Sequence, residues 1–225
     1  MTDQVPPARV GVLVSGGGTT LANLWRRIDA GELPAEIVAV VSSRPGARAL
    51  DIAAERKVPA SVVERSACAD RAEFGRRITD FLVAHDAHFV VLAGFLQLYP
   101  IPARFRGRVL NVHPALVPAF SGKGFYGSRV HEAAIAAGVR VSGCTVHFAD
   151  DEYDHGPIIV QRTVPVLDDD DATTLAARVF EAECQAYPEA LRLLIEGRLE
   201  VRGRRVHVRP AGAAQALAPP PPADG

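Results

Sequence analysis

The sequence predicts an α/β protein whose N-terminal half is Rossmann-like, with a doubly wound, mostly parallel sheet. Short apolar runs alternate with amphipathic stretches over about the first hundred residues, which is the pattern of repeated βαβ units. The apolar runs are nearly continuous, as in strands that are buried on both faces. Hydrophobic residues make up 48% of the 225 residues, so the chain can build a proper core as one large domain or two small ones.

The elements of the first half follow from these runs in chain order. Strands are predicted at Val10–Val14, Ile37–Val41, Ser61–Val63 and Phe89–Ala93. Helices are predicted between them, at Thr19–Asp29, Ala47–Arg56 and Arg71–His85. In the last of these helices Phe74, Ile78 and Leu82 recur every four residues and form an apolar stripe that would face the sheet.

After Gly94 the pattern changes, and a long segment rich in Gly, Pro and aromatic residues extends to Gly127. The strands predicted in this half are Arg108–Asn111, Cys144–Phe148, Ile158–Pro165, Leu199–Arg202 and Val206–Val208, and the helices are Val130–Ala137 and Ala172–Ile195. We expect a single domain over residues 8–208. Its N-terminal half, to about residue 100, would bind a phosphate and the remainder would carry the catalytic site, with a flexible Pro/Ala-rich tail at 209–225.

Composition and charge exclude several classes of function. The chain has 25 basic and 26 acidic residues and a net charge of -1, so no overall field would attract nucleic acid or an anionic membrane. The longest apolar run, Phe89–Leu96, is far shorter than the ~20 residues that a membrane-spanning helix needs. The N-terminus lacks a signal-peptide pattern, and the three cysteines are scattered singly. We therefore expect a cytoplasmic protein without nucleic-acid or membrane partners.

A glycine-rich turn, Ser15-Gly16-Gly17-Gly18-Thr19-Thr20, joins the first predicted strand to the first predicted helix. Backbone N–H groups and the helix dipole favour an anion there, and glycines let it approach closely. Leu21 stands where a dinucleotide fingerprint has Gly or Ala, and no Gly-Lys-Ser/Thr of a Walker loop follows. The turn therefore predicts a site for one phosphate monoester, and a tight turn without a ligand is the alternative.

Asn111 and His113 lie two residues apart at the end of a predicted strand, so both side chains would project from one face. Ligands of open α/β sheets bind at the carboxyl ends of strands. An ordinary strand end, with an Asx turn and a hydrogen-bonded imidazole, is the alternative.

An acidic segment that ends at Asp154 follows the predicted strand Cys144–Phe148. Its first three acids, Asp150 to Glu152, are typical of a solvated turn, and His147 is typical of a half-buried position in a sheet. A metal site made by His113, His147, Asp154 and His155 stays open as an alternative, although their spacing matches no recognised metal motif. We expect no metal.

Five segments together resemble the phosphoribosylglycinamide formyltransferases of the formyltransferase family. They are the glycine turn, Leu92–Phe95, Asn111–Pro118, Gly143–Phe148 and Asp154–Ile158, in the family's order between about Arg9 and Val208. The resemblance implies the formyltransferase fold. It also implies transfer of a formyl group from the co-substrate 10-formyltetrahydrofolate to the amine of 5-phosphoribosylglycinamide in purine (IMP) biosynthesis. We expect a monomer or a homodimer.

The resemblance makes Asn111, His113 and Asp154 the catalytic residues. Attack of an amine on a formyl carbon places negative charge on the carbonyl oxygen, which the Asn111 amide and a protonated His113 can stabilise. A carboxylate raises the pKa of a nearby imidazole, so Asp154 is expected to keep His113 protonated near neutral pH. No Gly-x-Ser-x-Gly elbow is present, and direct attack without a covalent enzyme intermediate is expected.

The resemblance also implies which residues bind the two substrates. For phosphoribosylglycinamide they are Gly18, Thr19 and Thr20 at the phosphate and Glu183 at the ribose region. For the folate they are Arg71, Leu96, Gln97, Leu98, Tyr99 and Asn111, with the backbone of 96–99 at the ring and the Arg71 cation near the glutamate tail. Three features depart from the family pattern: Gln97 replaces a frequent Arg, two residues are missing between Gly94 and Asn111, and the 121–127 loop is longer than in the shortest relatives.

Two other functions remain as alternatives. Similar Asn-His-Asp sites hydrolyse formyltetrahydrofolate or formylate other acceptors, such as methionyl-tRNA or a sugar nucleotide. The chain shows no regulatory domain before Val10, which argues against these uses. A non-catalytic nucleotide-binding module would need only the glycine turn, and it would leave Asn111, His113 and Asp154 unexplained.

Overall fold

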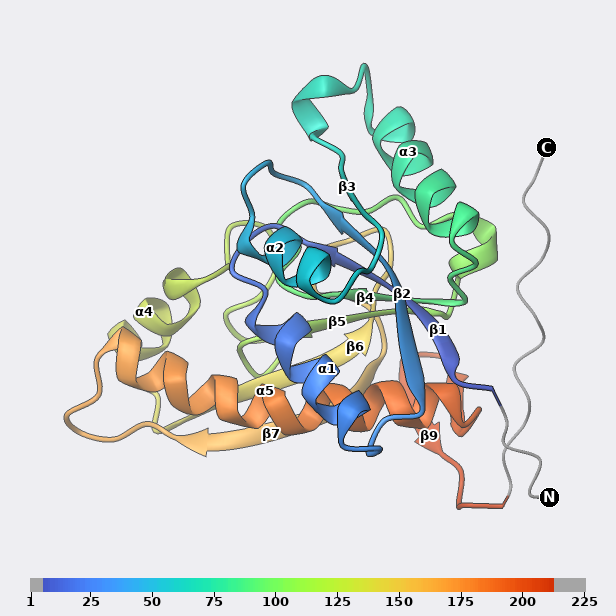
Figure 1. The fold of residues 1–225 in the computed structure, drawn as a ribbon. Helices are drawn as coiled ribbons and strands as arrows, with labels where there is room; N and C mark the ends of the chain where they lie inside the picture. Colours follow the sequence, from blue (N-terminus) through green and yellow to red (C-terminus); the bar gives the residue numbers. More distant parts are fainter. Residues whose placement is uncertain (1–5, 213–225) are drawn as a thin grey trace. The chain divides into compact units, whose positions relative to one another are not determined.

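The computed structural model describes residues 6–212, and its elements agree closely with the predicted ones (Figure 1). The strands are β1 Ala8–Val14, β2 Ala35–Ser42, β3 Ala60–Val62, β4 Phe89–Leu92, β5 Val109–His113, β6 Val141–Phe148, β7 Ile158–Pro165, β8 Leu199–Arg202 and β9 Arg205–Val208. The α-helices are α1 Thr19–Asp29, α2 Arg48–Glu55, α3 Arg71–Ala84, α4 Ser128–Ala136 and α5 Ala172–Ile195. From residue 213 on, the predicted tail lies outside the described residues.

The chain divides into two compact units, and the boundary lies between Arg108 and Val109, at the start of β5. The boundary therefore falls somewhat after the predicted change near residue 100. The expectation of one domain over residues 8–208 stays a prediction. Within residues 6–212, no helix of either unit is both long enough and apolar enough to cross a membrane.

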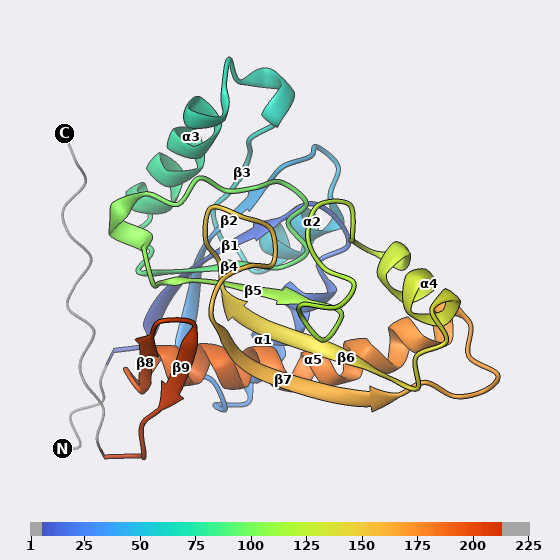
Figure 2. The ribbon, with the colours of Figure 1, turned by 180° about the vertical axis from the view of Figure 1, so that it is seen from behind.

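The first unit contains a parallel sheet with the strand order β3-β2-β1-β4. Helices α1 and α2 contact each other and share one face of β1 and β2 (Figures 1 and 2). In α3 the predicted apolar stripe of Phe74, Ile78 and Leu82 is completely buried. Gly11 of β1 faces this helix, since a Cβ atom there would collide with the Leu82 side chain. The unit is thus the parallel α/β half that the sequence predicts.

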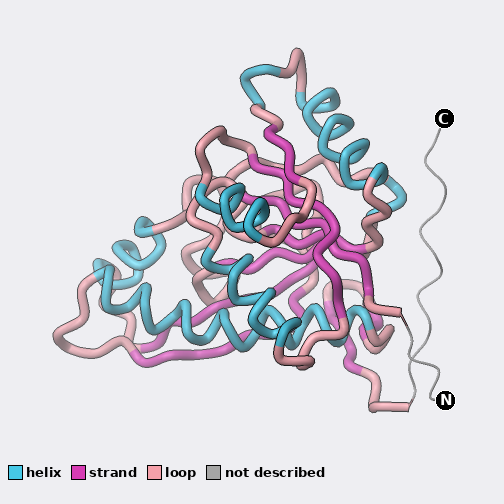
Figure 3. Tube along the Cα trace, viewed as in Figure 1, coloured by secondary structure: helices cyan, strands magenta, loops and turns pink. Residues whose placement is uncertain are grey.

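The second unit has the strand order β5-β6-β7-β9-β8, and most of its pairings are antiparallel. Helix α5 runs along β6 and β7, as Figure 2 shows. Tyr187 of this helix is fully buried and donates its hydroxyl to the carbonyl oxygen of Leu110 in β5, at 2.8 Å. A long loop separates β5 from α4 (Figure 3). The helix therefore fixes β5, the strand that carries Asn111 and His113.

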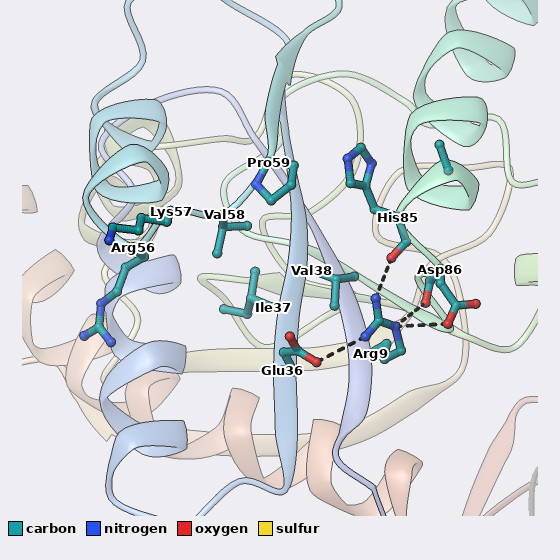
Figure 4. Close-up of a pocket in the computed structure, with 11 residues that line it drawn as sticks. Arg9, Glu36, Ile37, Val38, Arg56, Lys57, Val58, Pro59, His85 and Asp86 are labelled. Atoms are coloured by element: carbon teal, nitrogen blue, oxygen red, sulfur yellow. Dashed lines mark hydrogen bonds and ion pairs between the residues drawn. The ribbon is translucent and has the colours of Figure 1, made fainter.

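A hollow of about 460 Å³ lies at the amino-terminal edge of the first unit's sheet (Figure 4). Arg9 extends into it and binds Glu36 at 3.2 Å and the carbonyl oxygens of His85 and Asp86 at 3.1 Å each. Arg56 at its margin is paired with Asp29, at 2.7 Å. Both cations are neutralised within the unit. Arg9 connects β1, β2 and the turn after α3, and Arg56 connects the ends of α1 and α2.

Candidate active site

Strand β5 presents Asn111 and His113 on the same face, as the sequence predicts. The antiparallel register with β6 places His147 directly opposite Asn111 and Thr145 directly opposite His113. Opposite residues on one face of an antiparallel pair have neighbouring side chains. Both predicted residues are therefore next to polar side chains of β6.

Asp154 completes the group through an unusual backbone conformation. Its φ is 53°, in the left-handed region that is uncommon for a residue with a Cβ atom. At the following Gly156 a Cβ atom would collide with the carbonyl oxygen of Phe148, so the chain can return over β6 only with a glycine there. This return places Asp154 Oδ2 3.2 Å from His113 Nδ1, and Asp154 Oδ1 3.2 Å from Asn111 Nδ2. The three predicted catalytic residues thus meet in the second unit.

Asp154 differs from the acidic residues that precede it. Its side chain is 8% exposed, whereas Asp151 and Glu152 are exposed. Burial alone would raise the pKa of Asp154, but contacts with His147, His113 and the N–H of Gly122 outweigh burial and hold the pKa below its ordinary 3.8. Asp154 is therefore a carboxylate at neutral pH.

Both ring nitrogens of His113 face groups that can only accept a hydrogen bond. Nδ1 faces Asp154, and Nε2 lies 2.8 Å from the carbonyl oxygen of Phe120. The two acceptors are both satisfied only when the ring carries two protons. Phe120 has a φ of 49° and belongs to the long loop after β5. In this arrangement the loop covers the His113 side chain, which is 4% exposed.

The expected protonation of His113 needs correction. Burial lowers the pKa of His113, while Asp154 and the Phe120 carbonyl raise it, and the net result lies below the ordinary 6.5. The sequence-based expectation has the effect of Asp154 in the right direction. It omits the cost of placing a positive charge on a buried imidazole. In this arrangement burial therefore opposes the protonated form of His113 more strongly than Asp154 and the Phe120 carbonyl favour it.

His147 belongs to this group, although the sequence indicates only a half-buried position in a sheet. It is 1% exposed, and its Nδ1 lies 2.8 Å from the Phe148 carbonyl oxygen and must donate to it. Its Nε2 lies 3.1 Å from Asn111 Nδ2 and 3.7 Å from Asp154 Oδ1. The Asn111 amide nitrogen is thus shared between His147 and Asp154, which fixes the plane of the amide. Only the register between β5 and β6 reveals this contact.

Thr145 anchors the first part of the loop that covers His113. Its hydroxyl donates to the Ala115 carbonyl oxygen at 2.7 Å and accepts from the Val117 N–H at 3.0 Å. Gln161 of β7 adds bonds to the Thr145 hydroxyl and to the Val117 carbonyl oxygen. Because Thr145 is fully buried, the residues just after His113 are held in one position.

The glycine turn lies in the first unit, between β1 and α1. Gly18 has a φ of 74°, and a Cβ atom there would lie 2.9 Å from Ala49 Cα, so conformation and space both require glycine. At Gly16 and Gly17 a Cβ atom would have no heavy atom within 4 Å. Thr19 and Thr20 begin α1, whose first turn has no acidic residue. The turn is thus open toward an anion, and phosphate binding stays a prediction.

Two of the residues expected to bind folate in the first unit, Arg71 and Tyr99, belong to α3 or contact it. Phe95 stacks on Phe74 of α3 with ring centroids 6.2 Å apart, and the Tyr99 hydroxyl lies 2.8 Å from Thr79 Oγ1. Tyr99 is 1% exposed, so its side chain belongs to the core of the first unit. Arg71, the first residue of α3, is exposed. Their role in folate binding stays a prediction.

Glu183 lies on α5 in the second unit, and burial raises its pKa to about 7. The buried thiol of Cys144 in β6 has its pKa raised to about 12, chiefly by burial and further by Glu183. His155 is directed to Asp150, at 2.8 Å, and to Arg204, away from the catalytic group. Within residues 6–212, no three His, Cys, Asp or Glu side chains are arranged to hold a metal ion.

Comparison with protein families and curated proteins gives consistent matches. The family model described as "Formyl transferase" matches residues 8–191. Phosphoribosylglycinamide formyltransferase of Haemophilus influenzae is 34% identical over 196 residues, which cover 86% of this chain and 90% of that protein. The chloroplastic enzyme of the same name from Vigna unguiculata is 37% identical over 193 residues, which cover 85% of this chain and 62% of that protein. This chain therefore spans less than two thirds of the Vigna protein.

Solved structures agree with these matches. Glycinamide ribonucleotide transformylase 1 of Symbiobacterium toebii superposes with a TM-score of 0.86 at 38% identity, over 93% of this chain and 98% of that chain. A formyltetrahydrofolate deformylase of Pseudomonas syringae superposes with a TM-score of 0.79 at 25% identity, over 91% of this chain and 66% of that chain. The predicted α/β formyltransferase fold is confirmed.

Proposed function

Since this chain belongs to the formyl transferase family, we propose that it transfers the formyl group of 10-formyltetrahydrofolate to the amine of 5-phosphoribosylglycinamide in purine biosynthesis. The observation that carries the proposal is the buried contact of Asn111, His113 and Asp154 on one face of β5 and β6. The names of the Haemophilus influenzae and Symbiobacterium toebii relatives support the choice of acceptor. A cytoplasmic location and a monomeric or homodimeric state stay predictions.

In the proposed reaction the amine nitrogen attacks the formyl carbon, a C–N bond forms and the carbonyl electron pair moves to the oxygen. Hydrogen-bond donors from Asn111 and His113 stabilise this oxyanion. The bond between the formyl carbon and the folate nitrogen then breaks, and the folate nitrogen takes the electron pair and a proton from His113. Asp154, directly or through water, helps to accept the proton that the amine loses.

The hydrogen bonds that His113 and Asn111 make in this structure must be exchanged when substrate binds. The Nε2–H of His113 is used by the Phe120 carbonyl oxygen, and the Asn111 amide is shared between His147 and Asp154. A formyl oxygen that replaces the Phe120 carbonyl would receive the same N–H donor. Asp154 stays in contact with Nδ1 and favours the protonated ring.

The buried thiol of Cys144, near Glu183, is a poor nucleophile, which agrees with direct transfer. The pKa of Cys144 is raised to about 12, so very little thiolate exists at neutral pH. A covalent formyl–cysteine intermediate would need that thiolate. We therefore keep the reaction as a single transfer between the two substrates.

The rival within the family is hydrolysis of formyltetrahydrofolate, which the Pseudomonas syringae neighbour carries in its name. An assay that follows tetrahydrofolate release with and without phosphoribosylglycinamide separates the two reactions. If the chain transfers formyl groups, tetrahydrofolate should be released only when the acceptor is present, and formylated acceptor should appear with it. Equal release of formate without acceptor would assign the chain to hydrolysis, and no turnover under either condition would support a non-catalytic binding module.

A further inference from the structure

Two buried serines connect three loops at the carboxyl ends of the first unit's strands. Ser15 follows β1, Ser43 follows β2, and Leu96 lies in the segment after β4. The hydroxyl oxygens of Ser15 and Ser43 are 2.6 Å apart, and the N–H of Leu96 donates to Ser15 Oγ at 2.9 Å. The two serines are only 5% and 6% exposed. Side chains therefore join segments that are remote in the sequence.

Backbone hydrogen bonds join the first residues of these loops to the end of β1. The N–H of Ala93 bonds the Leu13 carbonyl oxygen at 2.8 Å, and the N–H of Ser43 bonds the Val14 carbonyl oxygen at 3.0 Å. Beyond these bonds the chain turns away at Gly94, whose φ is 71°. The Ser15 hydroxyl makes the next contact between the glycine turn and the segment Leu96–Tyr99.

We propose that Ser15 and Ser43 are positioning residues that hold the glycine turn and the segment Leu96–Tyr99 in one fixed arrangement. This inference rests on the proposed function, in which the turn binds the substrate phosphate and the segment binds folate through its backbone. Neither serine needs to touch a substrate. A shift of the turn or the segment would misalign backbone groups whose position sets affinity.

The direction of the hydrogen bonds makes the two serines unequal. An N–H can only donate, so Ser15 accepts from Leu96, and its own hydroxyl can then donate to Ser43 in a head-to-tail chain. Replacing Ser15 by Ala leaves the Leu96 N–H without this acceptor and removes the link to Ser43. Replacing Ser43 leaves the Leu96 bond intact. The effect on folate binding should therefore be larger for Ser15 than for Ser43.

The test measures kcat, KM for both substrates and thermal unfolding for Ser15→Ala, Ser43→Ala and the double variant. For Ser15→Ala we expect KM to rise about 5-fold for each substrate with kcat within about 2-fold of wild type. Ser43→Ala should raise KM mainly for phosphoribosylglycinamide, and the double variant should match Ser15→Ala. Ser142→Ala is the matched control, because Ser142 is 4% exposed but lies in β6 of the second unit. It should leave both KM values unchanged.

Unchanged KM values for a folded Ser15→Ala, or a lower melting temperature with KM unaltered, would overturn the inference, because the serines would then only stabilise the fold. If Ser15→Ala does not fold, the milder Ser43→Ala decides by the same criterion. Gly17→Val separates this failure from failure of the proposed function. A raised KM for phosphoribosylglycinamide in Gly17→Val with normal KM in the serine variants refutes the inference alone, whereas an unaltered KM in Gly17→Val refutes the phosphate site itself.

Discussion

The glycine turn of the first unit and the catalytic group of the second present opposite kinds of surface. The turn offers backbone N–H groups beside Gly16 and Gly17, where a Cβ atom would meet open space. The catalytic group consists of side chains that are almost fully buried and bonded to one another, with His113 3% exposed. We therefore expect the turn to depend on the absence of side chains, and the catalytic group to depend on the identity of its side chains.

The largest expected effect comes from His113→Ala. Loss of the donor and general acid should lower kcat by roughly 100- to 10,000-fold. The KM for phosphoribosylglycinamide should change little, because the glycine turn belongs to the other unit. Steady-state kinetics with circular dichroism on the same protein checks this. A kcat near wild type would remove His113 from the mechanism.

A smaller effect, on binding, is expected from Gly17→Val. The β-branched side chain would project into the open space where an anion approaches the backbone. We expect KM for phosphoribosylglycinamide to rise about 10-fold with little change in KM for the folate. Gly17 is the suitable position, since Gly18 is also needed for the fold. Equal loss of affinity for both ligands would indicate a collapsed turn.

The smallest of these effects is expected from His147→Phe, which keeps an aromatic ring but removes the ring nitrogen that lies next to the Asn111 amide. The amide would then lose one of its two partners, Asp154 being the other, and orient less well. We expect kcat to fall about 5-fold with both KM values close to wild type. An unchanged kcat would return His147 to the role of an ordinary core residue.

Much of the fold could be predicted because its signals are local. Helix α5 begins at Ala172 as predicted, and Asp171 before it forms a capping box with Thr174. The periodic burial of α3 follows the predicted stripe. Strand β6 begins at Val141, earlier than predicted, because its first residues pair with the end of β7 at Pro165. Pairing of that kind depends on a distant strand and leaves no local pattern.

The candidate site was predictable in its members but not in its contacts. Asn111, His113 and Asp154 stand out through strand position and family resemblance. Phe120 and Asp154 determine which atoms face the imidazole, and both have a positive φ although neither is glycine. No sequence pattern predicts that conformation. The role of His147 depends on the β5–β6 register. The pKa of His113 depends on burial by a loop, which only the assembled unit shows.

The central claim is that the Asp154 carboxylate favours the protonated form of His113 during formyl transfer. The most direct test is kcat against pH for wild type, Asp154→Asn and the exposed control Asp151→Asn. Asp154 raises the pKa of His113, so Asp154→Asn should lower that pKa further, while the wild-type value already lies below 6.5.

At the most acid pH both proteins hold His113 protonated, so the loss of kcat in Asp154→Asn should be smallest there. The loss should grow as pH rises through the two pKa values and level off above about 6.5, where both rings are mostly neutral. Asp151→Asn should follow the wild-type curve throughout. A loss in Asp154→Asn that is the same at every pH, or equal curves for the two Asn variants, would contradict the account.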